Sequence, residues 1–243
     1  MNFPLLKWIE PRKPYRLGLA LSGGGAKGLA YVGVFKFLEE RGIRPDVIVG
    51  TSAGAIAAVL WADGHTSDEI REMFAGREFS EFARVQVPTT GLFDSRGVSE
   101  FLKRNLRAKT FEELRIPTIV MATDLDNGCG HRFSSGPIVE AVRASCSIPI
   151  IFSPVVIDGV HYVDGGLFHN FPVSIIRDSC EMVIGVNVNP YTARKYSKGH
   201  LGGHFCYSVF YFCHYSFSLD SEEDGATCSK TSMTLVSLRP TIS

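Results

Sequence analysis

Two short apolar runs, each ending in a glycine-bearing turn that leads into a helical pattern, constrain the fold of this chain most strongly. The first spans residues 17–21 (LGLAL), and the second follows Pro45 (PDVIVG). Continuous apolar runs of this length are typical of strands buried on both faces. Helical patterns follow over residues 26–42 and 52–64. The order strand, helix, strand, helix predicts a parallel sheet with helices packed against it.

The same kind of signal continues to about residue 190. The residue patterns predict a helix with a capping box at Thr66 and Glu69, helices over 97–107 and 138–147, strands over 116–125 and 182–188, a partner strand for 116–125 near 132–134, and a hairpin that turns at Asp158-Gly159. After Pro190 the pattern changes, because residues 204–217 are rich in Phe and Tyr but follow neither the helical nor the strand period. We place a boundary near residue 190 and expect the segment beyond it to be disordered or poorly packed.

Composition narrows the class of function. The chain has 243 residues, of which 45% are hydrophobic, and 25 basic side chains balance 25 acidic ones. This balance is typical of a globular protein and gives no reason to expect nucleic-acid binding. The six cysteines show no CxxC spacing, so we expect neither a disulfide framework nor a metal site. We expect no signal peptide and no transmembrane helix, and therefore a cytoplasmic protein, with membrane-surface contact and oligomeric state left open.

The stretch GTSAG places Ser52 between Gly50 and Gly54, after a strand and before a helix. This is the nucleophile-elbow pattern, in which a serine stands on a tight turn and the flanking glycines let neighbouring backbone pass closely. The N–H groups of the following helix would face a developing anion. The alternative is a plain turn in which Ser52 is an ordinary helix N-cap.

A second glycine loop, SGGGAKG, also lies between a strand and a helix. Gly23, Gly25 and Gly28 match the dinucleotide-binding pattern G-x-G-x-x-G. The acidic residue that this pattern needs is missing, because the nearest candidate, Asp46, precedes the second strand instead of following it. In adjacent parallel strands the loop would lie beside Ser52, where its N–H groups could form an oxyanion hole. A nucleotide-binding or regulatory module with an inert Ser52 is the alternative.

The residue that takes the serine proton is left open by spacing alone. None of the seven histidines lies in a motif; these are His65, His131, His161, His169, His200, His204 and His214. Asp164 follows a short apolar stretch and precedes Gly165 and Gly166, which permit a sharp turn. A plain Asp-Gly turn is the simpler interpretation.

Three stretches together resemble the patatin-like phospholipases, especially their small bacterial members: residues 19–64, ASCSIPIIFSPV and YVDGGLFHNFPV. The resemblance covers roughly residues 15–190, which it identifies as the catalytic domain, with 191–243 as a divergent C-terminal segment. It implies a three-layer α/β/α fold with a mainly parallel central sheet. It also implies hydrolysis of acyl lipids without a cofactor or metal, through a dyad of Ser52 as nucleophile and Asp164 as base.

The same resemblance assigns supporting roles to the glycines. Gly23, Gly24, Gly25 and Gly28 would form the oxyanion hole, and Gly50, Gly54, Gly165 and Gly166 would support the two catalytic motifs. The implied partner is an acyl-lipid substrate: a phospholipid, a lysophospholipid or a related ester. Lipid head group, chain length and position of cleavage do not follow from the sequence.

Overall fold

The computed structural model describes residues 12–75, 84–85, 93–189 and 234–238, and within them the centre of the molecule is an eight-stranded sheet. Along the sheet the strands follow the order β10-β9-β1-β2-β5-β8-β7, and β6 pairs with β5. Their bounds are β1 Tyr15–Leu21, β2 Val47–Thr51, β5 Thr118–Asp124, β6 Cys129–Phe133, β7 Val155–Ile157, β8 Val160–Asp164, β9 Cys180–Asn187 and β10 Thr234–Leu238. A separate ribbon pairs β3 (Arg84–Val85) with β4 (Phe93–Asp94).

Strands β9, β1, β2 and β5 form the parallel centre of the sheet, and the strands around them pair antiparallel. All five residues of β2 are buried, as are the last four of β1. Burial on both faces explains why the sequences of these strands are continuous apolar runs. The carboxyl ends of β1 and β2 meet at one edge of the sheet, since Leu21 pairs with Gly50.

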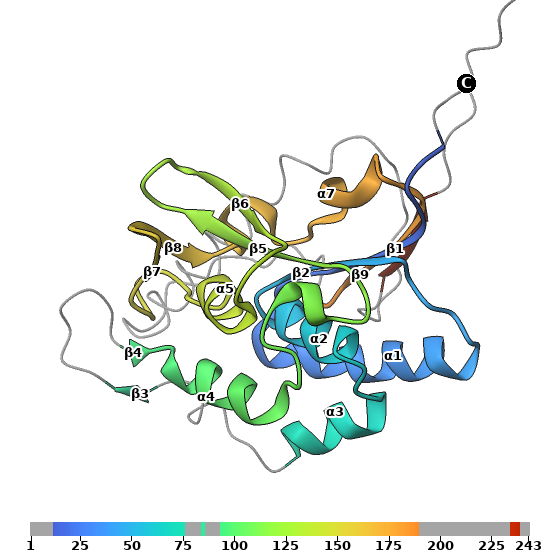
Figure 1. The fold of residues 1–243 in the computed structure, drawn as a ribbon, viewed down its shortest axis with the longest axis horizontal. Helices are drawn as coiled ribbons and strands as arrows, with labels where there is room; N and C mark the ends of the chain where they lie inside the picture. Colours follow the sequence, from blue (N-terminus) through green and yellow to red (C-terminus); the bar gives the residue numbers. More distant parts are fainter. Residues whose placement is uncertain (1–11, 76–83, 86–92, 190–233, 239–243) are drawn as a thin grey trace, which may run out of the picture.

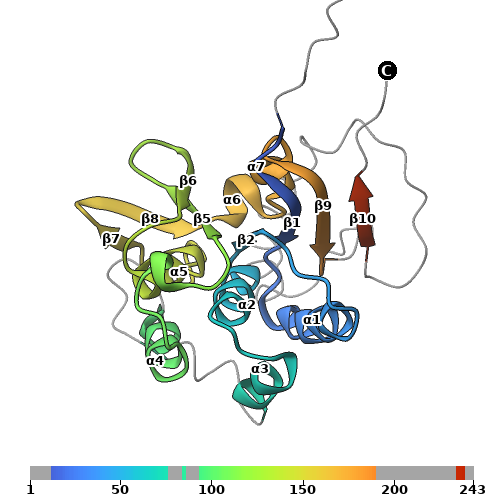
Figure 2. The same cartoon turned by 45° about the vertical axis from the view of Figure 1, so that its right-hand side comes forward.

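Helices cover both faces of the sheet unequally (Figure 1, Figure 2). On one face lie α1 Tyr31–Glu40, α2 Ala53–Ala62, α3 Ser67–Phe74, α4 Arg96–Asn105 and α5 Ile138–Ser145. The largest core cluster forms between them and the sheet, and it includes the fully buried Phe35, Leu60 and Leu102. The short helices α6 Gly166–His169 and α7 Val173–Arg177 lie on the other face, where Ile176 packs against Val47 and Val49. The predicted α/β/α layering is therefore confirmed.

The strand registers bring β2 and β8 end to end. Met121 of β5 pairs with Thr51 of β2 and with Arg132 of β6, so β2 and β6 occupy opposite edges of β5. The next residue, Ala122, pairs with β6 and with Asp164 of β8. Strand β8 therefore occupies the same edge as β2 and runs toward it. The last residues of both strands meet beside one point of β5, although they are more than a hundred residues apart in sequence.

Most predicted elements are found close to their expected bounds. Thr66 and Glu69 form the capping box of α3, and Asp158 and Gly159 turn the β7–β8 hairpin with φ values of 51° and 83°. The helix expected over residues 26–42 begins later than predicted: residues 25–30 form a 3₁₀ helix, and α1 begins only at Tyr31. Gly25 has a φ of 56°, outside the right-handed helical region, and Gly28 adds to the low helix propensity of this stretch.

Strand β10 was not predicted from the sequence. It pairs antiparallel with β9, from Thr234 opposite Asn187 to Leu238 opposite Val183. It lies within the segment for which we expected disorder or poor packing, so for these five residues that expectation was wrong. The aromatic stretch 204–217 lies outside the described residues.

Candidate active site

Ser52 occupies the turn between β2 and α2 with a φ of 52° and a ψ of −119°. A residue other than glycine held at positive φ costs about 1–3 kcal/mol and persists only where surrounding contacts impose it. Two sets of contacts do so here. The N–H of Ser52 donates to Ser145 Oγ at 2.8 Å, and its carbonyl accepts from the N–H groups of Ala55 and Ile56 in the first turn of α2. The turn has the strand-turn-helix form expected of a nucleophile elbow.

The two flanking glycines leave room that this turn needs. A Cβ on Gly50 would lie 2.4 Å from the carbonyl oxygen of Gly54, and a Cβ on Gly54 would lie 2.5 Å from that of Leu21. Any larger residue at either position would therefore push α2 away from the strand ends. The close approach of backbone that the GTSAG spacing predicts is present in the structure.

Asp164 is the last residue of β8 and is buried, with 6% of its surface exposed. Its carboxylate Oδ1 accepts the N–H of Gly166 at 2.7 Å, and the Ser52 side chain lies close enough to lower the pKa of this carboxyl. Burial raises the pKa of Asp164 from 3.8 to about 6, although the hydrogen bonds from Ser52 and Gly166 act in the opposite direction. A carboxylate with this pKa can accept a proton near neutral pH.

The glycine loop lies directly against Ser52. A Cβ on Gly23 would lie 3.4 Å from Ser52 Cβ, and a Cβ on Gly28 would lie 2.8 Å from Ala53 Cβ. The N–H of Gly23 donates to the carbonyl of Asn170 at 2.8 Å. Gly23 therefore differs from the expectation of an oxyanion donor, and its contribution here is space beside Ser52. Gly24 caps the 3₁₀ helix that begins at Gly25.

The second glycine pair supports Asp164 in two ways. A Cβ on Gly165 would lie 2.4 Å from the carbonyl oxygen of Met121, so the chain after β8 passes close to β5. Gly166 supplies the N–H that the Asp164 carboxylate accepts. All ten residues singled out from the sequence thus gather at one end of the sheet.

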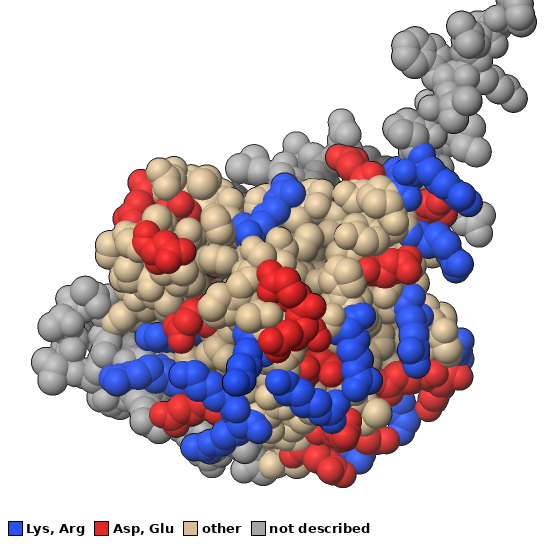
Figure 3. Space-filling view, in the orientation of Figure 1, with Lys and Arg blue, Asp and Glu red and all other residues tan. Residues whose placement is uncertain are grey.

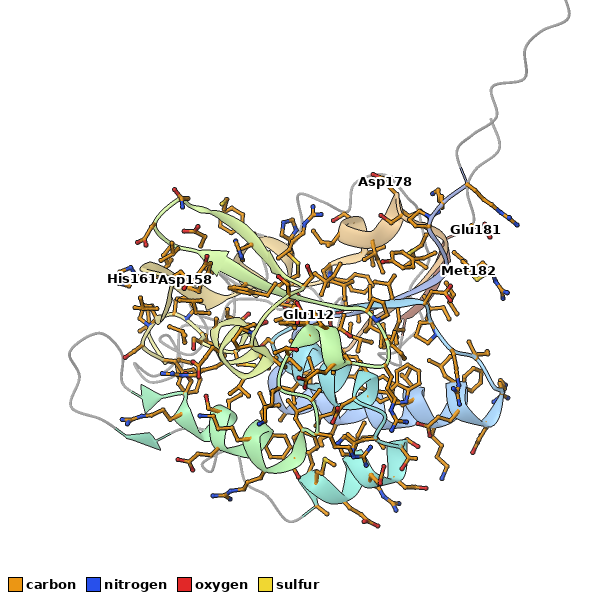
Figure 4. The ribbon with its side chains drawn as sticks, viewed as in Figure 1. Glu112, Asp158, His161, Asp178, Glu181 and Met182 are labelled. Carbon is orange, nitrogen blue, oxygen red and sulfur yellow. The ribbon has the colours of Figure 1, made fainter. Side chains whose placement is uncertain are left out.

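Four histidines fall within the described residues: His65, His131, His161 and His169. His65 is buried and contacts Asp63 and the carbonyl of Asn105. His161 lies next to the turn of the β7–β8 hairpin (Figure 4), and its Nδ1 contacts Asp126. The ring of His131 packs on Phe133 and Tyr162. The ring of His169 lies against β6, where a Cβ on Gly130 would be 2.5 Å from its Cδ2. The first three have contacts that are typical of structural or surface histidines.

An apolar pocket of about 170 Å³ opens beside Ser52. Its other lining residues come from the glycine loop, the four helices α1 to α4, and the stretch after α5: Gly25, Ala26, Gly28, Leu29, Tyr31, Val32, Phe35, Ala53, Ile56, Ala57, Ile70, Phe74, Val98, Cys146, Ile148 and Phe152. Such a lining suits a hydrocarbon chain, because burying each CH₂ group contributes about 0.8 kcal/mol.

Several residues of the site were not predicted from the sequence as parts of it. Ser145 accepts the N–H of Ser52, the carbonyl of Ser147 accepts the N–H of Asp164 at 2.9 Å, and Cys146 between them lines the pocket. Burial raises the pKa of the Cys146 thiol well above its ordinary value, which keeps the thiol protonated. The stretch ASCSIP was part of the family resemblance, and that was the only signal pointing to these residues.

Comparison with known proteins adds the family context. A family model described as "Patatin-like phospholipase" matches residues 19–176. The protein YqhO of Bacillus subtilis is 32% identical over 203 residues, which cover 70% of this chain and 70% of YqhO. An NTE family protein of Mycobacterium tuberculosis, Rv1063c, is 30% identical over 177 residues, which cover 72% of this chain and 49% of the relative. The chain thus spans about half the length of that relative.

Among solved structures, VipD from Legionella pneumophila aligns with a TM-score of 0.51 at 18% identity, over 69% of this chain and 49% of VipD. At this identity the likeness shows a shared fold. Among the described residues, no helix is long and apolar enough to cross a membrane. The same residues contain no group of three or more His, Cys, Asp or Glu side chains placed to hold a metal ion.

Proposed function

Since this chain belongs to the patatin-like phospholipase family, we propose that it is a serine acyl hydrolase that cleaves fatty-acyl esters of phospholipids, lysophospholipids or related acyl lipids. Membership of the family supports lipid hydrolase activity in general. The observation that carries the finer proposal is the junction of β2 and β8, which brings Ser52 beside the apolar pocket and close enough for its side chain to lower the pKa of the buried Asp164.

In the proposed first step, the Asp164 carboxylate accepts the Ser52 proton while Oγ attacks the ester carbonyl carbon. The bond from that carbon to the leaving oxygen then breaks, and Asp164 returns the proton to the departing alcohol. In the second step, Asp164 takes a proton from water, the hydroxide attacks the acyl-enzyme, and Ser52 leaves with the proton restored. The products are the alcohol, here a lysolipid or head-group fragment, and a fatty acid.

The charge on the ester oxygen needs donors during both steps. The N–H groups of Gly24 and Gly25 are the best placed candidates, because a helix begins at Gly25 and its first N–H groups have no partner within the helix. Gly23 gives space instead, since its N–H is already engaged by Asn170. The acyl chain would enter the apolar pocket. That apolar lining gives little support to a bound nucleotide in the same place.

The proposal is tested by covalent labelling and by replacement of the dyad. A fluorophosphonate probe should label wild-type protein at Ser52. Ser52→Ala should abolish labelling and lower ester hydrolysis on the order of 10⁴-fold or more, because the attacking atom is gone. Asp164→Asn, which keeps the shape of the side chain, should cause a similarly large loss.

Single histidine variants are the matched control. His65→Gln, His131→Gln, His161→Gln and His169→Gln should each retain a substantial rate, with the fold checked by circular dichroism. Hydrolysis that survives in purified Ser52→Ala would contradict the nucleophile. Loss of activity in one folded histidine variant would mean that a histidine, and not Asp164 alone, moves the proton.

A further inference from the structure

Three consecutive residues at the carboxyl end of α5 contact both members of the proposed dyad. Ser145 accepts the backbone N–H of Ser52 at 2.8 Å, and the carbonyl of Ser147 accepts the backbone N–H of Asp164 at 2.9 Å. Cys146, between them, lines the pocket beside Ser52. Residues 145 and 147 are fully buried, at 0% exposure. One short segment therefore fixes the nucleophile and the base relative to each other.

The Ser145 hydroxyl acts as both a hydrogen-bond donor and an acceptor. Its Oγ accepts from Ser52 and donates to the carbonyl of Met121 at 2.6 Å. Met121 marks the point of β5 at which β2 ends and β8 arrives, because it pairs with Thr51 while the next residue pairs with Asp164. The hydroxyl therefore ties the turn at Ser52 to the junction of the two strands that carry the dyad.

A second set of hydrogen bonds holds residues 145–147 in place. Ser147 Oγ donates to the carbonyl of Arg143 at 2.9 Å and lies 3.0 Å from Oγ of Ser95, the buried residue that precedes α4. The Ser147 side chain thus anchors the segment to α5 and α4, while its carbonyl holds Asp164. By contrast, the Ser145 side chain bonds directly to the backbone of the turn at Ser52.

We infer that Ser145 is a positioning residue, which holds the turn at Ser52 in its left-handed conformation and so keeps Ser52 Oγ in line with the Asp164 carboxylate. This inference rests on the proposed function. Removing the hydroxyl leaves the Ser52 N–H buried without its acceptor, and the backbone of the turn can then relax toward ordinary φ values. Misplacement of a nucleophile slows the chemical step without changing how the substrate is bound.

The experiment is Ser145→Ala, followed by the kinetics of fluorophosphonate labelling and of ester hydrolysis. The second-order rate constant for labelling and kcat should both fall about 10- to 100-fold, whereas KM should stay within about 2-fold. The labelling amplitude counts the folded protein, so partial unfolding lowers the amplitude and leaves the rate constant of the remaining protein unchanged. This separation distinguishes positioning from a general loss of stability.

Ser99→Ala is the matched control, because Ser99 is also a buried serine and its hydroxyl has no hydrogen-bond partner in the described part of the chain. It should label at the wild-type rate. If Ser145→Ala fails to fold, Ser145→Cys takes its place, since a thiol fills the site but makes weaker hydrogen bonds. Its rate constant should also fall.

Two outcomes separate the inference from the function on which it rests. Wild-type labelling at Ser52 together with a wild-type rate constant in the folded Ser145 variant would overturn the positioning role alone. Absence of labelling at Ser52 in wild-type protein would overturn the proposed function as well.

Discussion

Ser52 and Asp164 both carry an energetic cost that ordinary surface residues avoid. Ser52 holds a positive φ of 52°, and Asp164 is a carboxyl buried to 6% exposure. Each cost is offset by local contacts, from Ser145 for the turn and from Gly166 for the carboxylate. Backbone strain and raised pKa values gather at functional sites more often than elsewhere, and here the two occur on residues that meet at the junction of β2 and β8.

The pKa of Asp164 predicts the pH dependence of the reaction. Because the carboxyl must be ionised to accept a proton, kcat/KM should rise with pH and reach half its maximum at about pH 6. An unperturbed aspartate would give a midpoint near its ordinary value of 3.8. The measurement is a pH profile of ester hydrolysis on stable, folded protein. A profile that stays flat from about pH 5 to 8 would contradict this assignment.

The same carboxyl predicts a pH-dependent stability. Its pKa is higher in the folded chain than in the unfolded one, so the folded state binds the proton more tightly, and stability falls as pH rises from about 4 to about 6. Asp164→Asn removes the buried charge and should raise the melting temperature at about pH 8 more than at about pH 4. An equal change at both pH values would show that ionisation of Asp164 costs no stability.

At the scale of the element, the first turn of α2 packs on the end of β1 through Gly54. A Cβ there would lie 2.5 Å and 2.6 Å from the carbonyl oxygens of Leu21 and Ser22, which are backbone atoms that cannot swing aside. The position of α2, and with it that of Ser52, therefore depends on the absence of one methyl group.

Gly54→Ala should lower the free energy of unfolding by about 1–3 kcal/mol through overpacking, and should reduce activity because α2 shifts. Gly33→Ala is the matched control. Gly33 lies within α1, and a Cβ there would meet nothing within 4 Å. This control should instead stabilise the protein by about 0.5–1 kcal/mol, since alanine is the better helix former. Denaturant unfolding of both variants is the measurement, and a neutral Gly54→Ala would contradict the close packing.

At the scale of the whole molecule, the pocket beside Ser52 is assembled from elements that are distant in sequence. Leu29 comes from the glycine loop, Phe35 from α1, Ile70 from α3 and Val98 from α4. The outer surface contrasts with this apolar interior. On the face shown in Figure 3, Lys and Arg are interspersed with Asp and Glu, in keeping with equal numbers of each sign in the sequence.

The pocket predicts a limit on acyl-chain length. Val98→Phe adds volume to the lining, so hydrolysis of long-chain p-nitrophenyl esters should fall about tenfold or more relative to the shortest ester. Val98→Ile, which adds one carbon, should have a smaller effect in the same direction. The measurement is kcat/KM over a series of chain lengths. An unchanged profile in Val98→Phe would show that the acyl chain lies elsewhere.

The local elements of this protein could be predicted from the amino-acid sequence, because their signals lie within a few residues of each other. Buried strands, the capping box of Thr66 and Glu69 and the Asp158-Gly159 turn each follow from neighbouring side chains and backbone preferences. The elbow at Ser52 was predicted for the same reason, since strand, glycines and helix are contiguous. The choice of Asp164 as the base came from family resemblance and not from spacing.

Which distant residues meet could be seen in the folded chain and not in the local sequence patterns. The end-to-end arrangement of β2 and β8 along β5 brings Asp164 to Ser52, and the carboxyl end of α5 brings Ser145 to the turn between them. Strand β10, added to the sheet by its pairing with β9, was also invisible in the local pattern. Contacts of this kind depend on strand register and on packing between residues far apart in the chain, and a local sequence pattern specifies neither.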